Sequence, residues 1–195
     1  MPAVPLPRSF YERPAEEVAR DLLGAVLVST LNGARVTGRI VETEAYVGPH
    51  DPASHAAERI GRTARNDPMF GPPGTAYVYR IYGLHWCLNV VTGVEGYPAA
   101  VLIRALEPLE GVETMRDRRP GRSDRELASG PGRLAEALAV DGTMNRHDLI
   151  LPPLQIVGGE RVADADVVTG PRIGIRFAAD WPLRFHVRGC RWVSR

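Results

Sequence analysis

The sequence predicts a single domain of the α+β class, and two observations lead to that prediction. The dipeptide Asn32-Gly33 separates two strand-like runs, at residues 25–31 and 35–46, which is a strong signal for a β-hairpin. Strands joined in hairpins, with only a few short helices, favour α+β over a doubly wound parallel sheet. At 195 residues the chain can bury a core of its own, so we expect one domain over residues 1–195.

The remaining elements follow in order along the chain. Residues 1–9 are rich in proline and are expected to form a flexible tail. A short helix is predicted over residues 14–23, because proline suits a first helical turn and Glu16 and Glu17 favour the positive end of the helix dipole. Residues 48–74 form a long loop of a kind that tends to be functional. Further strands are predicted over residues 75–82 and 85–92 (a second hairpin), 99–106, 172–177 and 183–187, and further helices over residues 109–118 and 132–140.

Composition excludes several kinds of protein. No apolar run reaches the 18 residues of a membrane-spanning helix. The two cysteines, Cys87 and Cys190, make neither a disulfide framework nor a metal-ligand cluster, which favours the reducing cytoplasm. Single histidines such as His55 are usually structural or exposed, so we expect no metal.

Charge is informative through its distribution, because the net charge is only +1. Residues 172–195 hold six arginines against one acid, an excess that could face phosphates or form an ordinary solvated surface. All 24 basic residues are arginine, so the chain lacks the lysine amine that Schiff-base catalysis normally uses. Only the N-terminal amine remains, which would be that of Pro2 if Met1 is removed.

The strand that ends at Tyr46 carries two glutamates just before the long loop. Alternation would place Glu42, Glu44 and Tyr46, together with Ile40, on one face of the strand. Such a face is either a site or a place where the two glutamates pair with arginines. A carboxylate here could act as a general base, as a nucleophile or as a stabiliser of a positive transition state, which suits hydrolysis at a sugar carbon.

Three tyrosines follow on the next predicted strand. Tyr77 and Tyr79 share one face of it, and Tyr82 lies at the tip of the second hairpin. An exposed aromatic tip could insert into a DNA base stack, while ordinary packing of the three side chains is the alternative. Asn89 lies on the following strand and Arg104 on the one after it, where a buried arginine would need an acidic partner.

These segments form part of an ordered set of motifs that covers nearly the whole chain, roughly residues 10–193. The set comprises GRIVETEAYVG at 38–48, Arg65-Asn66 with Met69-Phe70, PGTAYVYRIYG at 73–83, Asn89, VLIRALEPLEG at 101–111, Ser129-Gly130-Pro131, Pro182-Leu183-Arg184-Phe185 and Val187-Arg188-Gly189. Together they resemble the alkyladenine (3-methyladenine) DNA glycosylase family. The resemblance implies a curved, mostly antiparallel sheet with a protruding β-hairpin. It also implies a base excision repair enzyme that acts as a monomer on damaged duplex DNA, in the cytoplasm and at the nucleoid if the chain is bacterial.

The resemblance implies catalytic roles for three residues. Glu44 would activate the water that attacks the sugar carbon of a nucleotide flipped out of the duplex, since chemistry on a base requires it to leave the stack. Arg104 would help to hold Glu44 and that water, and a backbone carbonyl near Ile173 would be the third partner of the water. The absence of lysine agrees with a monofunctional hydrolase that leaves the abasic strand uncut and uses no cofactor.

The resemblance also implies a base pocket. Tyr46, Tyr79 and His55 would line it and stack on both sides of the base, with the His55 backbone reading the edge of the base. Asn89 would crowd the exocyclic amine of guanine. Aromatic rings favour the positive charge of alkylated purines by about 0.5–2 kcal/mol through cation–π attraction. Alkylated or deaminated purines (3-methyladenine, 7-methylguanine, hypoxanthine and etheno-adducts) all fit such a pocket.

Outside the pocket, Tyr82 would fill the gap that the flipped base leaves in the duplex. Leu84 and His85 follow it and are expected to contact DNA. Arg133 is expected to bind phosphate on the basis of charge alone. Glu42 is assigned a structural role in which it pairs with an arginine.

Two other functions are compatible with parts of the sequence. A non-catalytic DNA- or RNA-binding module would not need both Glu44 and Arg104. A carbohydrate glycosidase that uses Glu42 and Glu44 meets a geometric difficulty. Side chains two residues apart on a strand point the same way, whereas glycosidase carboxylates flank the bond that is cleaved.

Overall fold

The computed structural model describes residues 4–194, and over that range eight strands join in one sheet whose pairings are all antiparallel. The main path runs β3 (Ala76–Ile81), β4 (His85–Thr92), β5 (Ala99–Pro108), β2 (Val36–Tyr46), β1 (Val26–Ser29), β6 (Leu154–Val157). Off this path, β8 (Arg184–Val187) pairs with both β2 and β7 (Val167–Gly170). The predicted α+β class is confirmed, as are the two predicted hairpins, β1–β2 and β3–β4.

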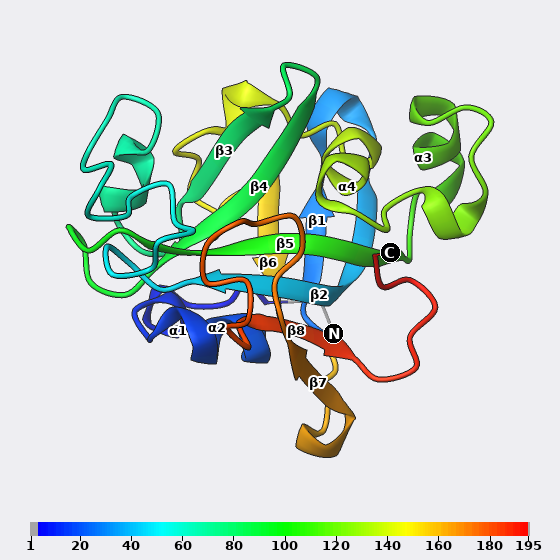
Figure 1. Ribbon diagram of the computed structural model, residues 1–195. Helices are drawn as coiled ribbons and strands as arrows, with labels where there is room; N and C mark the ends of the chain where they lie inside the picture. Colours follow the sequence, from blue (N-terminus) through cyan, green and yellow to red (C-terminus); the bar gives the residue numbers. More distant parts are fainter. Residues whose placement is uncertain (1–3, 195) are drawn as a thin grey trace.

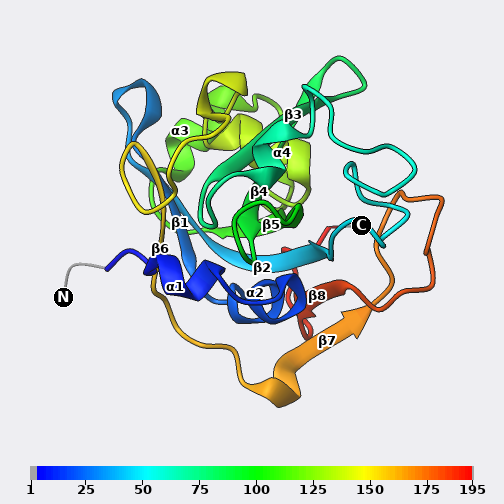
Figure 2. The same ribbon diagram turned by 90° about the vertical axis from the view of Figure 1, so that its left-hand side faces the viewer.

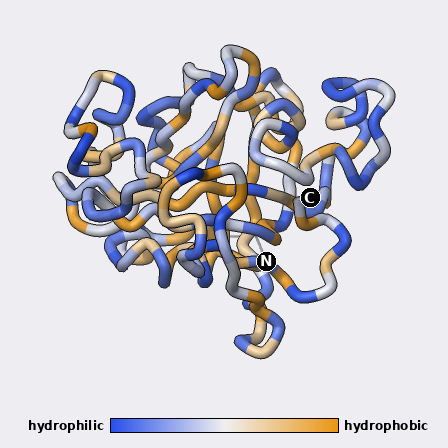
Figure 3. The backbone as a smooth tube through the Cα atoms, viewed as in Figure 1, coloured by the Kyte–Doolittle hydropathy of each residue, from blue (hydrophilic) through white to orange (hydrophobic). Residues whose placement is uncertain are grey.

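The sheet is strongly twisted, as Figures 1 and 2 show. In Figure 1, β2 and β5 cross the middle of the molecule, while β3 and β4 rise steeply from them and end in a tip that stands clear of the domain. The curved sheet and the protruding hairpin that the resemblance implied are therefore present. Figure 3 shows that hydrophobic positions concentrate in the central strands and hydrophilic ones in the outer loops.

Strand β2 carries Glu42, Glu44 and Tyr46, and it contains an irregularity that alternation alone did not predict. Its edge opposite β5 pairs first with β1, over residues 36–39, and then with β8, over residues 42–44. Between these stretches its register with β5 shifts around residues 40–43, as at a β-bulge. The bulge changes the phase of the side chains, so Ile40 belongs to the main hydrophobic core, as Ala45 does. The prediction that Ile40 shares a face with Glu42 and Glu44 is therefore wrong.

The helices are short and cover the sheet. The predicted first helix is α2 (Ala15–Asp21), whose Ala19 carbonyl accepts a 2.7 Å hydrogen bond from Thr43 Oγ1 of β2. The other α-helices are α1 (Arg8–Tyr11), α3 (Val112–Arg118) and α4 (Pro131–Ala137). None of the helices in the described part of the chain is long and apolar enough to cross a membrane.

The proline-rich beginning of the chain is not a flexible tail over residues 4–9. Pro5 forms a β-bridge with Val157, and the Leu6 amide donates a 3.0 Å hydrogen bond to the Ile156 carbonyl. Arg8 then begins α1 and forms an ion pair with Asp148 at 2.5 Å. These contacts hold the segment against the edge strand β6. Composition alone gives no sign of this packing. Residues 1–3 lie outside the described residues.

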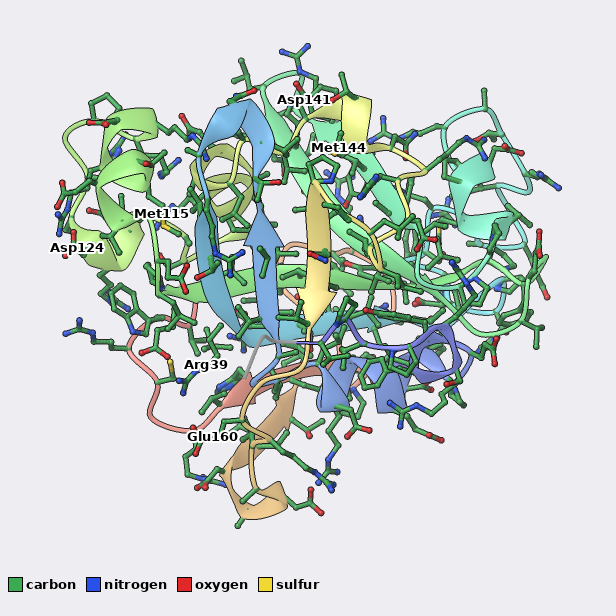
Figure 4. All side chains as sticks on the ribbon, turned by 180° about the vertical axis from the view of Figure 1, so that it is seen from behind. Arg39, Met115, Asp124, Asp141, Met144 and Glu160 are labelled. Atoms are coloured by element: carbon green, nitrogen blue, oxygen red, sulfur yellow. The ribbon has the colours of Figure 1, made fainter. Side chains whose placement is uncertain are left out.

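Three late segments differ from the prediction. Residues 172–177 form bends and not a strand, because the edge of β2 that they pass is already paired with β8. Strands β6 and β7 were not predicted, since each has only four residues and β7 has no fully buried side chain to produce a hydrophobic pattern. Figure 4 shows the side chains from behind, where Arg39 of β2 and Glu160 lie close together. Their nearest charged atoms are 3.9 Å apart, so the segment after β6 packs beside β2.

A second, smaller hydrophobic cluster holds the long loop, residues 47–75, against the sheet. It consists of residues from the loop and from β3, β4 and β5, namely Ala56, Met69, Tyr77, Val91 and Ala100. Asn66 joins two parts of the loop, because its side-chain amide donates 2.7 Å hydrogen bonds to the carbonyls of His55 and Gly61. The loop is therefore an ordered wall over one face of the sheet, and this wall forms one side of the candidate site.

Candidate active site

Four neighbouring strands place one residue each in a row across the sheet. Tyr77 of β3 pairs with Asn89 of β4, Asn89 pairs with Leu102 of β5, and Leu102 pairs with Glu44 of β2. Next to this row lies a cavity of about 350 Å³, a size typical of small-molecule sites. The structure brings most of the predicted site residues into its lining: Tyr46, His55, Tyr79, Tyr82, Asn89, Arg104 and Ile173.

Glu44 lies behind this lining and is fully buried. Its Oε1 is 3.1 Å from Arg104 Nη1 and accepts a 2.7 Å hydrogen bond from the Ile173 backbone N–H. Its Oε2 accepts a 3.1 Å hydrogen bond from the Tyr46 hydroxyl. Residue 173 therefore contacts Glu44 through its amide, and the role expected for a carbonyl near it stays a prediction.

The surroundings of Glu44 set its protonation. Burial raises the pKa of this carboxyl above its ordinary value, although Arg104, the Ile173 amide and the Tyr46 hydroxyl each lower it. Burial and the neighbouring Glu44 raise the pKa of Tyr46, so its hydroxyl keeps the proton that it donates. Burial lowers the pKa of Arg104, but the negative charges of Glu44 and Glu42 together raise it by more. The pKa therefore lies above its ordinary value, and Arg104 stays a cation. A carboxylate of raised pKa beside a fixed cation has the properties of a general base.

Glu42 has a different environment, although it lies only two residues away. Its Oε1 accepts hydrogen bonds from Arg104 Nε at 3.1 Å, Arg184 Nε at 2.6 Å and Ser194 Oγ at 2.9 Å. Its Oε2 accepts the Ser194 backbone N–H at 2.7 Å. Oε1 thus accepts from three donors and Oε2 from one. The expected pairing of Glu42 with an arginine is therefore observed, and the two carboxylates share Arg104 instead of standing on opposite sides of a cavity.

The walls of the cavity are aromatic and held by hydrogen bonds. The rings of His55 and Tyr79 are 4.5 Å apart, edge to face, and His55 Nδ1 lies 2.8 Å from the Tyr77 hydroxyl. Burial lowers the pKa of His55 to about 4, so this imidazole is neutral at physiological pH. Asn89 Nδ2 donates a 3.0 Å hydrogen bond to the Tyr77 carbonyl, which fixes the orientation of the Asn89 amide.

The hairpin tip presents large apolar side chains to solvent. Tyr82 is 84% exposed and Leu84 is 71% exposed. Tyr82 has φ +54° and Gly83 has φ +69°, and two successive positive values are the pattern of a type I′ turn. A non-glycine residue in this left-handed region pays about 1–2 kcal/mol. The turn thus holds an aromatic residue in a conformation that glycine would adopt more easily.

A second cavity, of about 570 Å³, adjoins the first and shares Arg104 and Pro131 with it. Of the predicted DNA contacts, His85 and Arg133 line this second cavity, while Leu84 lines neither. A Cβ atom on Gly132 would come within 2.9 Å of His85 Cβ, so only glycine lets α4 begin this close to β4. Arg119 and Arg122 also line the cavity, which therefore gathers three guanidinium groups besides Arg104.

Two buried residues near the site were not predicted from the sequence. Arg172 and Asp51 both have 0% exposed side chains and form an ion pair at 2.5 Å. No local pattern could have found this pair, because the two residues are 121 positions apart. Cys87 also lines the cavity, and here alternation was a usable signal, since Cys87 lies two residues before Asn89 and pairs with Tyr79. Over the described residues, no three His, Cys, Asp or Glu side chains converge in a way that could hold a metal ion.

Comparisons with known proteins agree on one family. The family model described as methylpurine-DNA glycosylase matches residues 9–191. A protein of Carboxydothermus hydrogenoformans is 51% identical over 97% of this chain and 98% of its own length. Proteins of Rhodopseudomonas palustris and Myxococcus xanthus are 53% and 51% identical, each over 97% of this chain and over 90% and 93% of their own lengths. All three carry the name "Putative 3-methyladenine DNA glycosylase".

The matches confirm the resemblance that the motifs indicated and the expected enzyme class, a DNA glycosylase, which is a hydrolase of N-glycosyl bonds. They extend over nearly all of the chain and therefore include the strands and loops that surround Glu44. The chain belongs to the methylpurine-DNA glycosylase family.

Proposed function

We propose that this chain rotates an alkylated or deaminated purine out of duplex DNA and hydrolyses its N-glycosidic bond with water that Glu44 activates. The purine leaves, the sugar keeps a hydroxyl from the water, and the abasic strand stays uncut. The observation that carries this proposal is a buried carboxylate of raised pKa directly behind an aromatic-lined cavity.

The hydrogen-bond partners of the two carboxylates support Glu44 as the base. Its carboxylate makes three contacts, with Arg104, the Ile173 amide and the Tyr46 hydroxyl. One of its roughly four acceptor positions therefore remains, on Oε2, for a proton of the attacking water. Glu42 is held by Arg104, Arg184 and Ser194, and of these three only Arg104 lines the aromatic-lined cavity, whereas all three partners of Glu44 line it. The negative charge of Glu44 would also stabilise the oxocarbenium-like transition state of glycosidic bond cleavage.

The cavity walls support a purine as the substrate group. Tyr46, Tyr79 and His55 supply ring surfaces, and neutral His55 adds no positive charge to repel a cationic alkylated base. Asn89 lies in the central row with its amide orientation fixed by the Tyr77 carbonyl. A rigid polar group at that position is suited to exclude a base that carries an additional exocyclic amine, as guanine does.

The surface around the cavity supports duplex DNA as the macromolecular substrate. Tyr82, at the tip of the β3–β4 hairpin, would enter the stack where the purine has left, and Leu84 would contact the adjacent bases. His85 and Arg133, in the adjoining cavity, would contact the phosphate backbone. The monofunctional assignment rests on the absence of lysine from all 195 residues.

A single-turnover assay of base release tests the role of Glu44. Duplexes that each carry 3-methyladenine, 7-methylguanine, hypoxanthine or an etheno-adduct should lose that base in the presence of the wild-type protein. Glu44→Gln should slow release by about 10²–10⁴-fold, the usual contribution of a general base, while binding to the lesion duplex is retained.

Glu107→Gln is the matched control. It makes the same chemical change on β5, where Glu107 is partly exposed and pairs with Arg39 at 3.6 Å. This variant should release bases at the wild-type rate. Full activity in Glu44→Gln would remove Glu44 from the mechanism, and absence of base release by the wild type from every duplex would refute the proposed function.

A further inference from the structure

The ion pair between Asp51 and Arg172 is the only one among the described residues in which both side chains are 0% exposed. Arg172 Nη1 donates to Asp51 Oδ2 at 2.5 Å and Nη2 donates to Oδ1 at 2.9 Å, so the pairing is bidentate. Arg172 Nη1 also donates a 3.0 Å hydrogen bond to the Ala45 carbonyl of β2. Asp51 in turn accepts the Ala53 backbone N–H at 3.0 Å.

Stability alone does not account for such a pair. Removing two charges from water is unfavourable by several kcal/mol per ion, and well-packed apolar side chains of similar volume often serve as well or better. The value of the pair lies in geometry, because a bidentate arginine holds its partners in fixed directions. Here it connects three segments that are distant in sequence: the end of β2, the start of the long loop and the segment after β7.

Arg172 is connected directly to two of the three groups that hold Glu44. Its Cζ lies 4.7 Å from the centre of the Tyr46 ring, and the Tyr46 hydroxyl donates to Glu44 Oε2. The peptide that follows Arg172 carries the N–H of Ile173, which donates to Glu44 Oε1 at 2.7 Å. Only the third group, Arg104, reaches Glu44 independently of Arg172.

We propose that Asp51 and Arg172 are positioning residues that fix the orientation and the basicity of Glu44 through Tyr46 and the Ile173 amide. This inference rests on the proposed function, in which Glu44 is the base. Neither residue lines the cavity, so neither would touch the substrate. The pair also joins the two segments that contribute His55 and Ile173 to the cavity lining.

The substitution Arg172→Lys tests the positioning role. Lysine keeps the positive charge but loses both the bidentate pairing and the planar stacking on Tyr46. The rate of single-turnover base release should fall by about 10- to 100-fold, because a displacement of about 1 Å at a catalytic group has effects of that size. Affinity for the lesion duplex, measured in the Glu44→Gln background, should change less than about threefold.

A second readout separates positioning from a general structural role. The hydrogen bonds from Ile173 and Tyr46 both lower the pKa of Glu44. Their loosening in Arg172→Lys should therefore raise that pKa and move the acid limb of the pH–rate profile to higher pH. A merely structural defect would reduce the active fraction equally at every pH and leave the midpoint of the limb in place.

Arg13→Lys is the matched control. Arg13 makes the same kinds of contact on the far side of β2, with the Asp21 carboxylate at 2.7 Å, the Phe10 carbonyl at 3.0 Å and the Phe10 ring at 4.6 Å. It is absent from the cavity lining, so its substitution should change neither the rate nor the midpoint. If Arg172→Lys does not fold, Asp51→Asn tests the same pair, since it keeps the size of the Asp51 side chain and removes the charge that Arg172 binds.

Carbon-13 NMR titration of the glutamate carboxyls follows Glu44 without any need for activity, so the two proposals fail in different ways. A wild type that releases no base refutes the proposed function. A wild type that releases base, together with an Arg172→Lys (or Asp51→Asn) variant whose rate and Glu44 pKa are unchanged, overturns only the positioning role. The positioning role is also overturned if Arg172→Lys and Arg13→Lys lose rate to the same extent and the pKa of Glu44 does not shift. A higher Glu44 pKa with a slower rate in Arg172→Lys alone supports it.

Discussion

Substitutions of Tyr82 should move the stability of the protein and its affinity for DNA in opposite directions. Tyr82 is 84% exposed, so its side chain contributes little to the folded domain, yet it has φ +54°, which disfavours any side chain. Glycine adopts this conformation without strain. Tyr82→Gly therefore removes a side chain that the fold does not need and that, under the proposed function, binding to DNA does need.

The expected magnitudes follow from these two properties. Relief of the left-handed conformation is worth about 1–2 kcal/mol, and the greater flexibility of glycine in the unfolded chain offsets about 0.5–1 kcal/mol of it. Tyr82→Gly should therefore raise the free energy of unfolding by up to about 1.5 kcal/mol, while Tyr82→Ala, which keeps the strain, should leave it unchanged. Stacking of an aromatic side chain on a base contributes about 1–3 kcal/mol, so both variants should bind a lesion duplex about 5- to 150-fold more weakly.

Two measurements test the expected changes in stability and in DNA affinity. Urea unfolding gives the stability of each variant, and fluorescence anisotropy with a lesion duplex gives the affinity, in the Glu44→Gln background to prevent turnover. Leu151→Ala is the control, because Leu151 is 55% exposed but lies outside the hairpin and both cavities. Wild-type affinity in both Tyr82 variants would refute the insertion of Tyr82 into the base stack. Weaker binding without any gain of stability in Tyr82→Gly would instead refute the account of the strained turn.

Two further predictions concern the chemistry. Because burial raises the pKa of Glu44, its basic form is lost at a higher pH than in an exposed glutamate, so the rate of base release should fall with an acid midpoint above about 4.3; a midpoint at or below that value, from a pH series of single-turnover rates, would contradict the raised pKa. Sodium borohydride should trap no covalent adduct between the protein and a lesion duplex, since none of the 195 residues is lysine; a trapped species on a denaturing gel would point to the amine of Pro2 and refute the monofunctional assignment.

Local signals predicted the elements that carry strong patterns. Strands β3, β4 and β5 have runs of buried residues bounded by glycine and proline, and the helix at Pro14 has an acidic first turn, so each appeared close to its predicted bounds. Strands β6 and β7 escaped because each is only four residues long and forms by pairing with a distant strand. Residues 172–177 show the converse, since their β-branched residues suit a strand but the neighbouring edge of β2 is occupied.

For the site, the sequence by itself determined which chemical groups are present: a carboxylate beside a long loop, tyrosines on one strand face and at a hairpin tip, and no lysine. These follow from residue identity and from the period of a strand, which are local properties. The sequence also contained the ordered motifs that indicated the family. It left Glu42 and Glu44 equivalent as far as strand spacing was concerned.

Only the tertiary structure decided between the two glutamates in physical terms. Arg184 and Ser194, from the end of the chain, bind Glu42, while Glu44 is bound by Tyr46 and the Ile173 amide, two residues that line the cavity. Likewise, the Asp51–Arg172 ion pair joins two residues that are 121 positions apart in the sequence. The hydrogen-bond partners, the burial and the pKa of a carboxylate depend on which distant segments pack around it, and no local pattern in the chain encodes that arrangement.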